Sequence, residues 1–280
     1  MTKEKIMVAF SGGRTSAYMC YWLQENMRHL YDLHFVYANT GLEHEKTLDF
    51  VNLVDEYFGL DLVWLEAKIS KEQGVGTGYT ITDYLNATRG GKLFNDLCAA
   101  YGLPNKDYPH CTRELKNIPM KKYANDEIGK NIRVALGIRY DEFNRIKLRP
   151  DAIYPLATII KKTKQEILNW WSRQPFDLEI EEHYGNCVGC YKKNAKKLQK
   201  IANENPQYFD HFIEMEQKYS SVKTKSDKGD RRIYRYNRTA YEVKHNLKLP
   251  AECETQDECA EECGSIFSDY ISEKAEERLF

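Results

Sequence analysis

Two short motifs combine residue types that bind anions and metals. The first is residues 11–16, Ser-Gly-Gly-Arg-Thr-Ser, which follow the apolar run 6–10 and open a stretch of helical character at 15–29. Glycines let the backbone turn sharply and approach a ligand, and a helix N-terminus offers unpaired N–H groups to an anion. We interpret these six residues as a phosphate-binding loop: Ser11, Gly12, Gly13, Arg14, Thr15 and Ser16. A tight turn without a ligand is the alternative.

The second motif is a pair of cysteines at metal-ligand spacing, Cys187-x-x-Cys190, in a turn that contains glycine. Two such thiolates hold one tetrahedral ion or two corners of an iron–sulfur cluster, and they can also be a redox pair. Cys111 begins a predicted helix, where the helix dipole favours the thiolate. We expect Cys111, Cys187 and Cys190 to bind a metal centre, with a [4Fe-4S] cluster ahead of zinc; buried thiols are the alternative. The fourth ligand stays open among three residues: Cys98, His110 and His183.

The elements around these motifs predict an α/β fold. Apolar runs of strand length alternate with helical periodicity, which is typical of a doubly wound, mostly parallel sheet. The expected strands are residues 6–10, 34–38, 62–65 and 132–136. Ligands of such sheets bind outside the carboxyl ends of the strands. Two polar segments follow strands and so belong beside the loop, the first with Asn39, Thr40 and Gly41, the second with Gly137, Arg139, Glu142 and Arg145.

Length and charge suggest three regions within the 280 residues. We expect an α/β domain at 1–190, with a flap or insertion at 70–110 near the site. Residues 191–250 read as a basic helical extension, since 190–250 holds 15 Lys and Arg against 7 Asp and Glu. Residues 251–280 form an acidic tail with 2 Lys and Arg against 10 Asp and Glu, and contain Cys253, Cys259 and Cys263.

The sequence also predicts a cytoplasmic protein. The start, Met-Thr-Lys-Glu-Lys, leads into a strand and lacks the apolar core of a signal peptide. No apolar run approaches the ~20 residues that a membrane span needs. Eight cysteines in such a chain point to metal binding or catalysis before disulfides.

Six motifs in order resemble the phosphoadenosine phosphosulfate (PAPS) reductase family, within the PP-loop ATP pyrophosphatase, or adenine nucleotide alpha hydrolase-like, superfamily. Residues 11–16 resemble the PP-loop Ser-Gly-Gly-x-Asp-Ser, and 187–190 resemble the family's Cys-x-x-Cys. The other matching segments are 37–43, 111–116, 137–145 and 154–171. Thr15 stands where the PP-loop has aspartate, and Asn39 stands where the family has aspartate before Thr-Gly.

The resemblance implies an adenine nucleotide, either ATP or PAPS and adenylyl sulfate, with its phosphate end on residues 11–16. It implies magnesium with the nucleotide, although Thr15 weakens that expectation. Asn39, Thr40 and Gly41 would lie near the ribose or base. Arg139 and Arg145 would assist with anionic charge. The residues that the resemblance makes candidates for catalysis are Cys111, Arg113, Lys116 and Cys263.

Three functions follow as hypotheses. The first is an ATP-dependent enzyme that adenylates a nucleic acid (tRNA or DNA, bound through residues 191–248) and inserts sulfur through the cluster, supplied by a cysteine desulfurase. The second is a PAPS or adenylyl-sulfate reductase in which Cys263 attacks sulfur and a thioredoxin-like partner regenerates it. The third is a nucleotide- or zinc-binding module without catalysis. We favour the first, a sulfurtransferase, over the second, an oxidoreductase.

Overall fold

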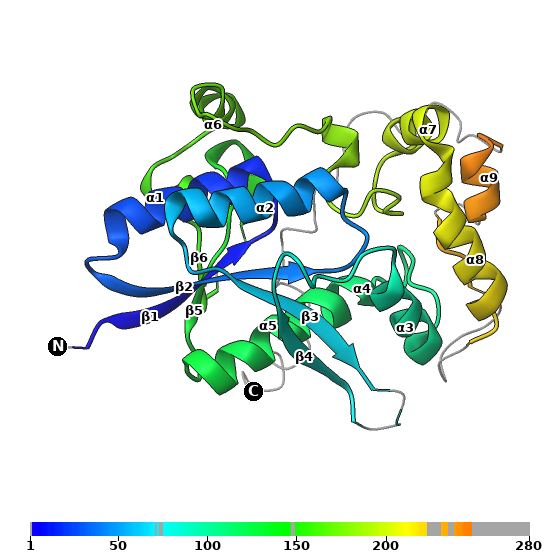
Figure 1. Ribbon diagram of the computed structural model, residues 1–280, viewed down its shortest axis with the longest axis horizontal. Helices are drawn as coiled ribbons and strands as arrows, with labels where there is room; N and C mark the ends of the chain where they lie inside the picture. Colours follow the sequence, from blue (N-terminus) through cyan, green and yellow to red (C-terminus); the bar gives the residue numbers. More distant parts are fainter. Residues whose placement is uncertain are drawn as a thin grey trace.

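The computed structural model describes residues 2–70, 72, 75–146, 149–222, 231–234 and 238–247. Within them one sheet has the strand order β4-β3-β2-β1-β5-β6 (Figure 1). All neighbouring strands run parallel except the pair β3 and β4, which is antiparallel. The strands are β1 (Glu4–Phe10), β2 (Tyr31–Asn39), β3 (Val63–Ile69), β4 (Thr77–Thr82), β5 (Arg133–Ala135) and β6 (Ala152–Ile153). The predicted doubly wound, mostly parallel α/β fold is confirmed.

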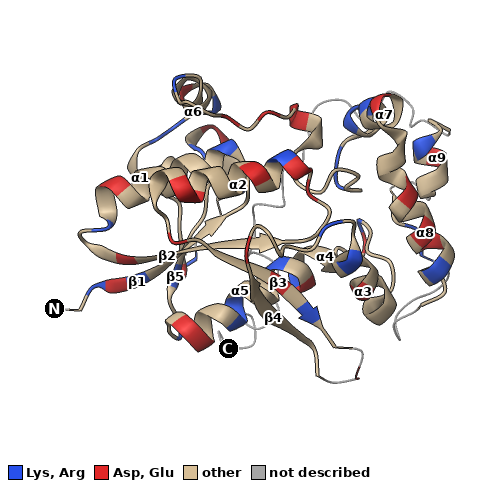
Figure 2. Cartoon of the chain, viewed as in Figure 1, with Lys and Arg blue, Asp and Glu red and all other residues tan. Residues whose placement is uncertain are grey.

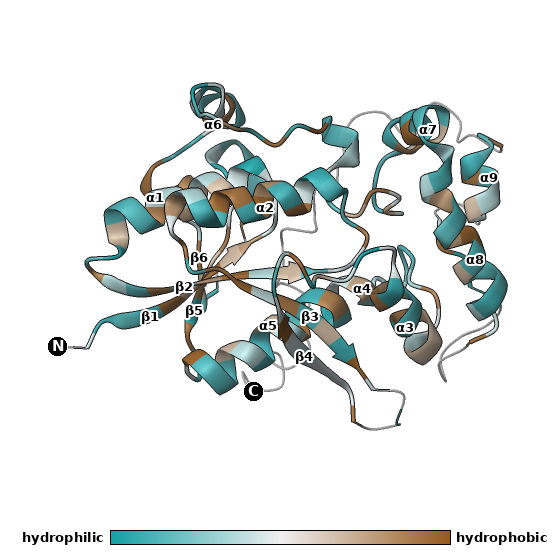
Figure 3. Cartoon of the chain, viewed as in Figure 1, coloured by the Kyte–Doolittle hydropathy of each residue, from teal (hydrophilic) through white to brown (hydrophobic). Residues whose placement is uncertain are grey.

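Three helices cover one face of the sheet (Figure 1): α1 (Arg14–Met27), α2 (Glu45–Phe58) and α6 (Lys164–Trp171). Their apolar residues form one core with the side chains of that sheet face. Hydrophobic and hydrophilic segments therefore alternate along α2 (Figure 3), as expected for a helix with one buried stripe. Trp171 of α6 is buried, and its indole N–H donates to the carbonyl of Arg14 at 2.9 Å, which ties α6 to the start of α1.

A continuous helical segment covers the opposite face. It consists of α4 (His110–Thr112), the π-helical turn η1 (Arg113–Asn117), α5 (Ile118–Tyr123) and the π-helical turn η2 (Ala124–Ile128). The chain stays helical through Pro119, which lies in the first turn of α5 directly after a π turn. Such turns are rare and occur often at functional sites.

The region 70–110, expected to be a flap or insertion, is only partly irregular. Strand β4 pairs with β3 at the edge of the sheet. The helix α3 (Lys92–Tyr101) buries Leu93, Phe94, Leu97 and Cys98. These side chains pack in the same core as helices that follow residue 190, so most of this region is part of the framework.

The helices after residue 190 pack beyond the carboxyl ends of the strands (Figure 1): α7 (Ala195–Glu204), α8 (Asp210–Tyr219) and α9 (Ala240–Lys244). They share a core with α3 and η1, so residue 190 lies inside one packed unit. Arg231, Tyr234 and Arg238 of the expected basic surface are buried. The expected acidic tail, with Cys263, lies outside the described residues. None of the helices described is both long and apolar enough to cross a bilayer.

Candidate functional site

A cavity of about 310 Å³ opens at the carboxyl ends of the central strands. The loop 11–16 forms one wall, and the 3₁₀ helix η3 (Tyr140–Arg145), the start of α6 and the Cys187–Cys190 turn form the others. Its lining includes every residue of the predicted phosphate loop and four further predicted residues: Gly137, Arg139, Glu142 and Arg145. The structure thus brings together residues from two strand ends that the sequence separates by more than a hundred positions.

The loop 11–16 presents the uncapped start of α1 to this cavity. Gly13 is the N-cap residue, no side chain caps the helix, and no acidic residue lies in its first turn. The first N–H groups of a helix have no partner within it. The Ser16 hydroxyl lies 2.8 Å from the Ser11 hydroxyl and accepts from the Ser11 N–H at 3.1 Å, which closes the loop on itself. This arrangement suits an anion such as a phosphate.

Arg14 has a different role from the one its position suggests. Its guanidinium binds Asp177 through two hydrogen bonds, of 2.6 and 2.9 Å, and also donates to the carbonyl of Leu178. Bidentate Arg–carboxylate pairs are strong and geometrically specific. Arg14 therefore fixes the loop to the segment after α6, and it also lines the cavity.

Arg139 contacts the start of α1. It is largely buried and donates to the Thr15 hydroxyl at 3.2 Å, at the position where the PP-loop motif has aspartate. Asp141 and Glu142 pair with the same guanidinium, at 3.0 and 3.4 Å. At Gly137 an added Cβ would lie 3.1 Å from the Ser16 Cα, so glycine permits the end of β5 to approach α1 and brings Arg139 into reach.

The three predicted thiol ligands meet in a second, smaller pocket. Cys111, Cys187 and Cys190 all line it. The Cys111 sulfur lies 3.3 Å from the Tyr191 hydroxyl, and the Cys187 sulfur lies 3.2 Å from the Thr40 hydroxyl. Cys190 lines this pocket and also the large cavity. The thiol site and the loop 11–16 therefore face spaces that share one wall.

The Cys187–Cys190 turn is held in place by its neighbours on both sides. An isolated β-bridge joins Cys187 to Glu43, and the Val188 N–H donates to the Leu42 carbonyl at 3.0 Å. At Gly189 an added Cβ would meet Phe212 of α8 at 2.3 Å. Only glycine fits at position 189 while α8 packs this closely.

None of the three candidates for a fourth ligand lines the thiol pocket. Cys98 is fully buried in α3, and burial, with the neighbouring Cys111, raises the pKa of its thiol. His110 faces the Gly102 carbonyl at 3.1 Å, and burial lowers the pKa of its imidazole to about 4. His183 pairs with Glu204 instead. Among the described residues the pocket therefore offers three cysteines.

A buried polar network lies behind Cys187. Thr40 donates its hydroxyl to Glu43 at 2.6 Å, and the Lys116 ammonium lies 3.8 Å from the same carboxylate. The side chains of Lys116 and Glu43 are 7% and 2% exposed. Lys116 and Thr40 thus line the thiol pocket and not the large cavity, whereas Thr40 was predicted to lie near the ribose or base. Arg113 pairs with Glu114 and lines neither pocket. Glu43 was not among the predicted site residues, although it lies in the segment 37–43 that resembles the family.

Asn39 supports the site from inside the sheet. It is fully buried, and its side-chain amide donates to Glu66 at 2.6 Å and to the Thr88 carbonyl at 2.8 Å. Its amide oxygen accepts from the Gly41 N–H at 3.1 Å. The side chain predicted to lie near a nucleotide therefore orders the turn at 39–41, and it lines neither pocket.

Replacing Asn39 by alanine should lower the free energy of unfolding by about 1–3 kcal/mol, because buried donors and acceptors lose their partners. Urea denaturation followed by circular dichroism measures the change. Asn26→Ala is the matched control, since Asn26 is exposed and donates to one helical carbonyl. Equal stability of Asn39→Ala and the natural protein would contradict a structural role for Asn39.

Four lysines complete the cavity and were not singled out from the sequence: Lys164, Lys192, Lys193 and Lys197. Lys197 and Lys164 pair with Glu182 at 2.9 and 3.0 Å, and these hydrogen bonds lower the pKa of Glu182 to about 2. The lining holds seven Lys and Arg against three Glu, so an anion is the favoured ligand. Figure 2 shows the basic and acidic positions on the helices around the cavity. Lys192 and Lys193 follow Cys190 after a single residue, Tyr191, which was the available sequence signal.

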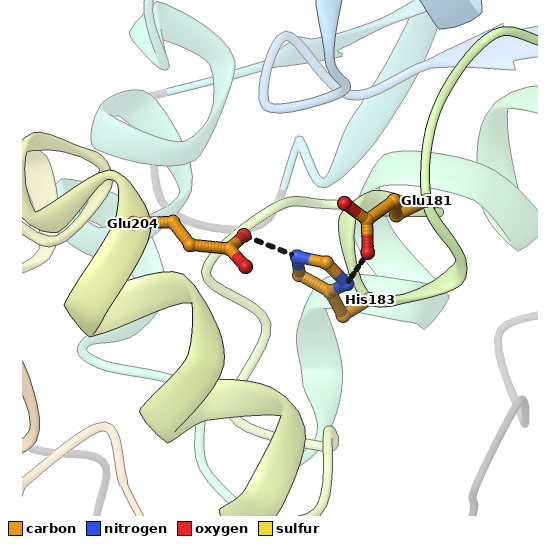
Figure 4. Close-up of side chains that lie close together, drawn as sticks. All are labelled: Glu181, His183 and Glu204. Carbon is orange, nitrogen blue, oxygen red and sulfur yellow. Dashed lines mark hydrogen bonds and ion pairs between the residues drawn. The ribbon is translucent and has the colours of Figure 1, made fainter.

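A histidine between two carboxylates lies next to the cavity (Figure 4). The buried His183 is 2.8 Å from Glu204 and 3.6 Å from Glu181. Among the residues that the structure describes, this is the group of three whose possible metal-ligand atoms all lie within 4.8 Å of one another. Lys200 pairs with both carboxylates, and Tyr184 donates to Glu204. We interpret the group as an ion-pair cluster that anchors the segment before Cys187 to α7.

Fold and cavity together define the class: a doubly wound α/β protein with an anion-binding type of loop at the carboxyl ends of its strands. The chain belongs to the family of the uncharacterized nin region protein ORF290 of Escherichia phage lambda, with which it is 40% identical over 196 residues, 69% of this chain and 67% of that protein. It is also similar to the uncharacterized protein MJ0066 of Methanocaldococcus jannaschii, at 24% identity over 78% of this chain and 42% of that protein. No family model matches the chain.

Among solved structures, the chain is similar to the U34-tRNA thiolase NcsA from Methanococcus maripaludis with its [4Fe-4S] cluster. The similarity covers 82% of this chain and 77% of that chain, with a TM-score of 0.39 and 15% sequence identity. A likeness this distant carries no argument about function, so the function has to be argued from the site itself.

Proposed function

We propose that the protein is an adenine-nucleotide-dependent sulfur-transfer enzyme, which activates a nucleic acid by adenylation and then replaces an oxygen by sulfur at a cluster-bearing thiol site. One observation carries the proposal: Cys190 lines both the cavity below the loop 11–16 and the pocket of the three cysteines. A phosphate bound at that loop and a sulfur bound near the thiols would therefore lie on the two sides of Cys190.

The reaction balances without a redox step. A carbonyl oxygen of the acceptor attacks the α-phosphorus of ATP, and pyrophosphate leaves. Hydrosulfide then attacks the activated carbon, the C–O bond breaks, AMP leaves with the oxygen, and one proton is released. A persulfide from a cysteine desulfurase can replace hydrosulfide only if a thiol reductant accompanies it.

The chain's own residues support the first of these steps. The start of α1 would bind the phosphates through backbone N–H groups. Arg139 and Arg145, which line the same cavity, would stabilise the charge that develops on the leaving pyrophosphate. Thr15 cannot bind magnesium as an aspartate would, and its hydroxyl already accepts from Arg139. We therefore assign charge neutralisation in this site to arginine and lysine.

The donor set of the second pocket suits an iron–sulfur cluster. Three cysteines line it among the described residues, and three thiolates can bind three separate irons of one cluster. Cys111, Cys187 and Cys190 would hold the cluster, and hydroxyls at two of the sulfurs would tune it. A cluster with three protein ligands keeps one iron open for the sulfur to be transferred.

The test is a turnover assay on protein purified without oxygen. With ATP, sulfide and total RNA or DNA, we expect AMP and pyrophosphate to form and a thiolated nucleoside to appear by mass spectrometry. A colourless zinc protein that forms no AMP would overturn the proposal. Sulfite release from PAPS, lost in Cys263→Ser, would instead establish the reductase, and nucleotide binding without turnover would establish a non-catalytic module.

A further inference from the structure

An exposed aromatic pair lies beside the nucleotide cavity. In η3, the residues Arg139, Glu142 and Arg145 recur every three positions and line the cavity. Tyr140 and Phe143 follow one position later with the same spacing, line no part of it, and are 47% and 59% exposed. The backbone kinks at Glu142 (φ −112°, ψ 28°), between the two aromatic residues. The segment 139–145 therefore lines the cavity with three residues and exposes two aromatic side chains beside it, which together form an aromatic face.

A third apolar side chain and several lysines adjoin this aromatic face. Ile159 belongs to the π-helical turn η4 (Pro155–Ile159), which contacts η3, and is 51% exposed. The Tyr140 N–H donates to the Lys162 carbonyl at 2.9 Å, which holds the segment 160–164 against η3. Three lysines follow Ile159 within this segment: Lys161, Lys162 and Lys164.

The charge of this surface favours an anionic partner. Lys161 is exposed and pairs with no carboxylate in the described part of the chain, whereas Lys162 pairs with Glu166 at 3.3 Å. Lys164 lines the cavity and pairs with Glu182 at 3.0 Å, so the lysine row leads from the aromatic pair into the proposed nucleotide site. The two acidic side chains between the aromatic residues, Asp141 and Glu142, pair with Arg139 at 3.0 and 3.4 Å.

Single exposed aromatic residues are common on protein surfaces, so the position of this pair matters more than its exposure. Tyr57 is 57% exposed, lies at the end of α2 and does not line the cavity. Tyr140 and Phe143 instead combine stacking surface with a basic row and an anion-binding cavity. Proteins that bind single-stranded nucleic acids use this combination of aromatic platform and cationic groove.

We propose that Tyr140, Phe143 and Ile159 form a stacking platform for a single-stranded nucleic acid, whose backbone follows Lys161, Lys162 and Lys164 to the cavity. The inference rests on the proposed function and specifies its acceptor: unpaired nucleotides next to the reacting base would stack on the aromatic pair. This surface differs from the basic segment 191–248, in which Arg231, Tyr234 and Arg238 are buried.

The test measures binding of a fluorescein-labelled, mixed-sequence 20-nucleotide RNA or DNA strand by fluorescence anisotropy at several salt concentrations. Tyr140→Ala and Phe143→Ala should each weaken binding about tenfold, and the double variant about a hundredfold, because each lost stack costs a comparable factor. Tyr57→Ala is the matched control and should bind as the natural protein does. Lys161→Ala should reduce the slope of affinity against salt, since it removes a phosphate contact.

A parallel titration with ATP keeps the two proposals apart. Every platform variant should bind ATP as tightly as the natural protein, because neither aromatic side chain lines the cavity. If the natural protein binds ATP but no oligonucleotide, or if the double variant binds the oligonucleotide normally, the platform is overturned and the nucleotide chemistry remains. If binding depends on both aromatics but no AMP forms in the turnover assay, the platform stands and the proposed function fails.

Sedimentation velocity tests the other occupant of such a surface, a second copy of the chain. The platform predicts the same sedimentation coefficient for the natural protein and the double variant. A dimer that dissociates in the double variant, with unchanged oligonucleotide affinity, would identify the face as a self-association surface and overturn the inference.

Discussion

Replacing Cys187 by alanine should remove iron and acid-labile sulfide from protein purified without oxygen, with a fall of more than about tenfold. Changes outside the metal's direct ligands already cost 10–100-fold in affinity, and Cys187 is one of only three cysteines that line the thiol pocket among the described residues. Iron and sulfide analysis, together with the visible absorption spectrum, measures the loss. Cys111→Ala and Cys190→Ala should behave alike.

Cys20→Ala is the matched control for this experiment. Cys20 is a fully buried thiol of α1 in the core between that helix and the sheet, away from the thiol pocket. The Cys20→Ala protein should keep its full iron content and lose some stability. A Cys187→Ala protein that retains the brown chromophore would contradict the assigned ligands. Loss of the chromophore in Cys98→Ser, with the fold intact, would identify Cys98 as an additional ligand.

Gly12→Ala should lower the affinity for ATP by more than about tenfold. Gly12 has a φ of +82°, and an added Cβ would lie 3.0 Å from the Thr47 Cγ2 and 3.3 Å from the Tyr37 ring. Left-handed backbone costs a non-glycine residue about 1–2 kcal/mol, and the contact with α2 prevents the loop from keeping its shape. Because the loop carries the N–H groups that would bind phosphate, its displacement removes the binding site. Titration with a fluorescent ATP analogue measures the change.

Gly76→Ala is the control that separates the effect of backbone strain from the effect of the position of Gly12 in the loop 11–16. Gly76 has a comparable φ of +70°, but an added Cβ there meets nothing within 4 Å, and Gly76 does not line the cavity. The Gly76→Ala protein should lose a similar amount of stability to backbone strain, and it should bind ATP normally. If both variants bind ATP as the natural protein does, the loop 11–16 is not the phosphate site, and the cavity has to be assigned to another ligand.

The local chemistry of this protein follows from short stretches of sequence. Apolar runs predict the strands because a parallel strand is buried on both faces. The loop 11–16 and the pair Cys187 and Cys190 are likewise local motifs. Their function depends on backbone conformations and spacings that adjacent residues determine, so the sequence alone identifies them.

Long-range packing decided the rest. Cys111 joins Cys187 and Cys190 only because α8 and the segment 42–43 hold the Cys187–Cys190 turn against η1. Tertiary contacts also turned predicted ligands into supports: Arg14 pairs with Asp177, and Asn39 with Glu66. Arg231 and Arg238, which composition had suggested as part of a basic surface, are buried. Whether a charged side chain faces a ligand, a carboxylate or the core depends on residues far away in the chain, and no local pattern encodes those partners.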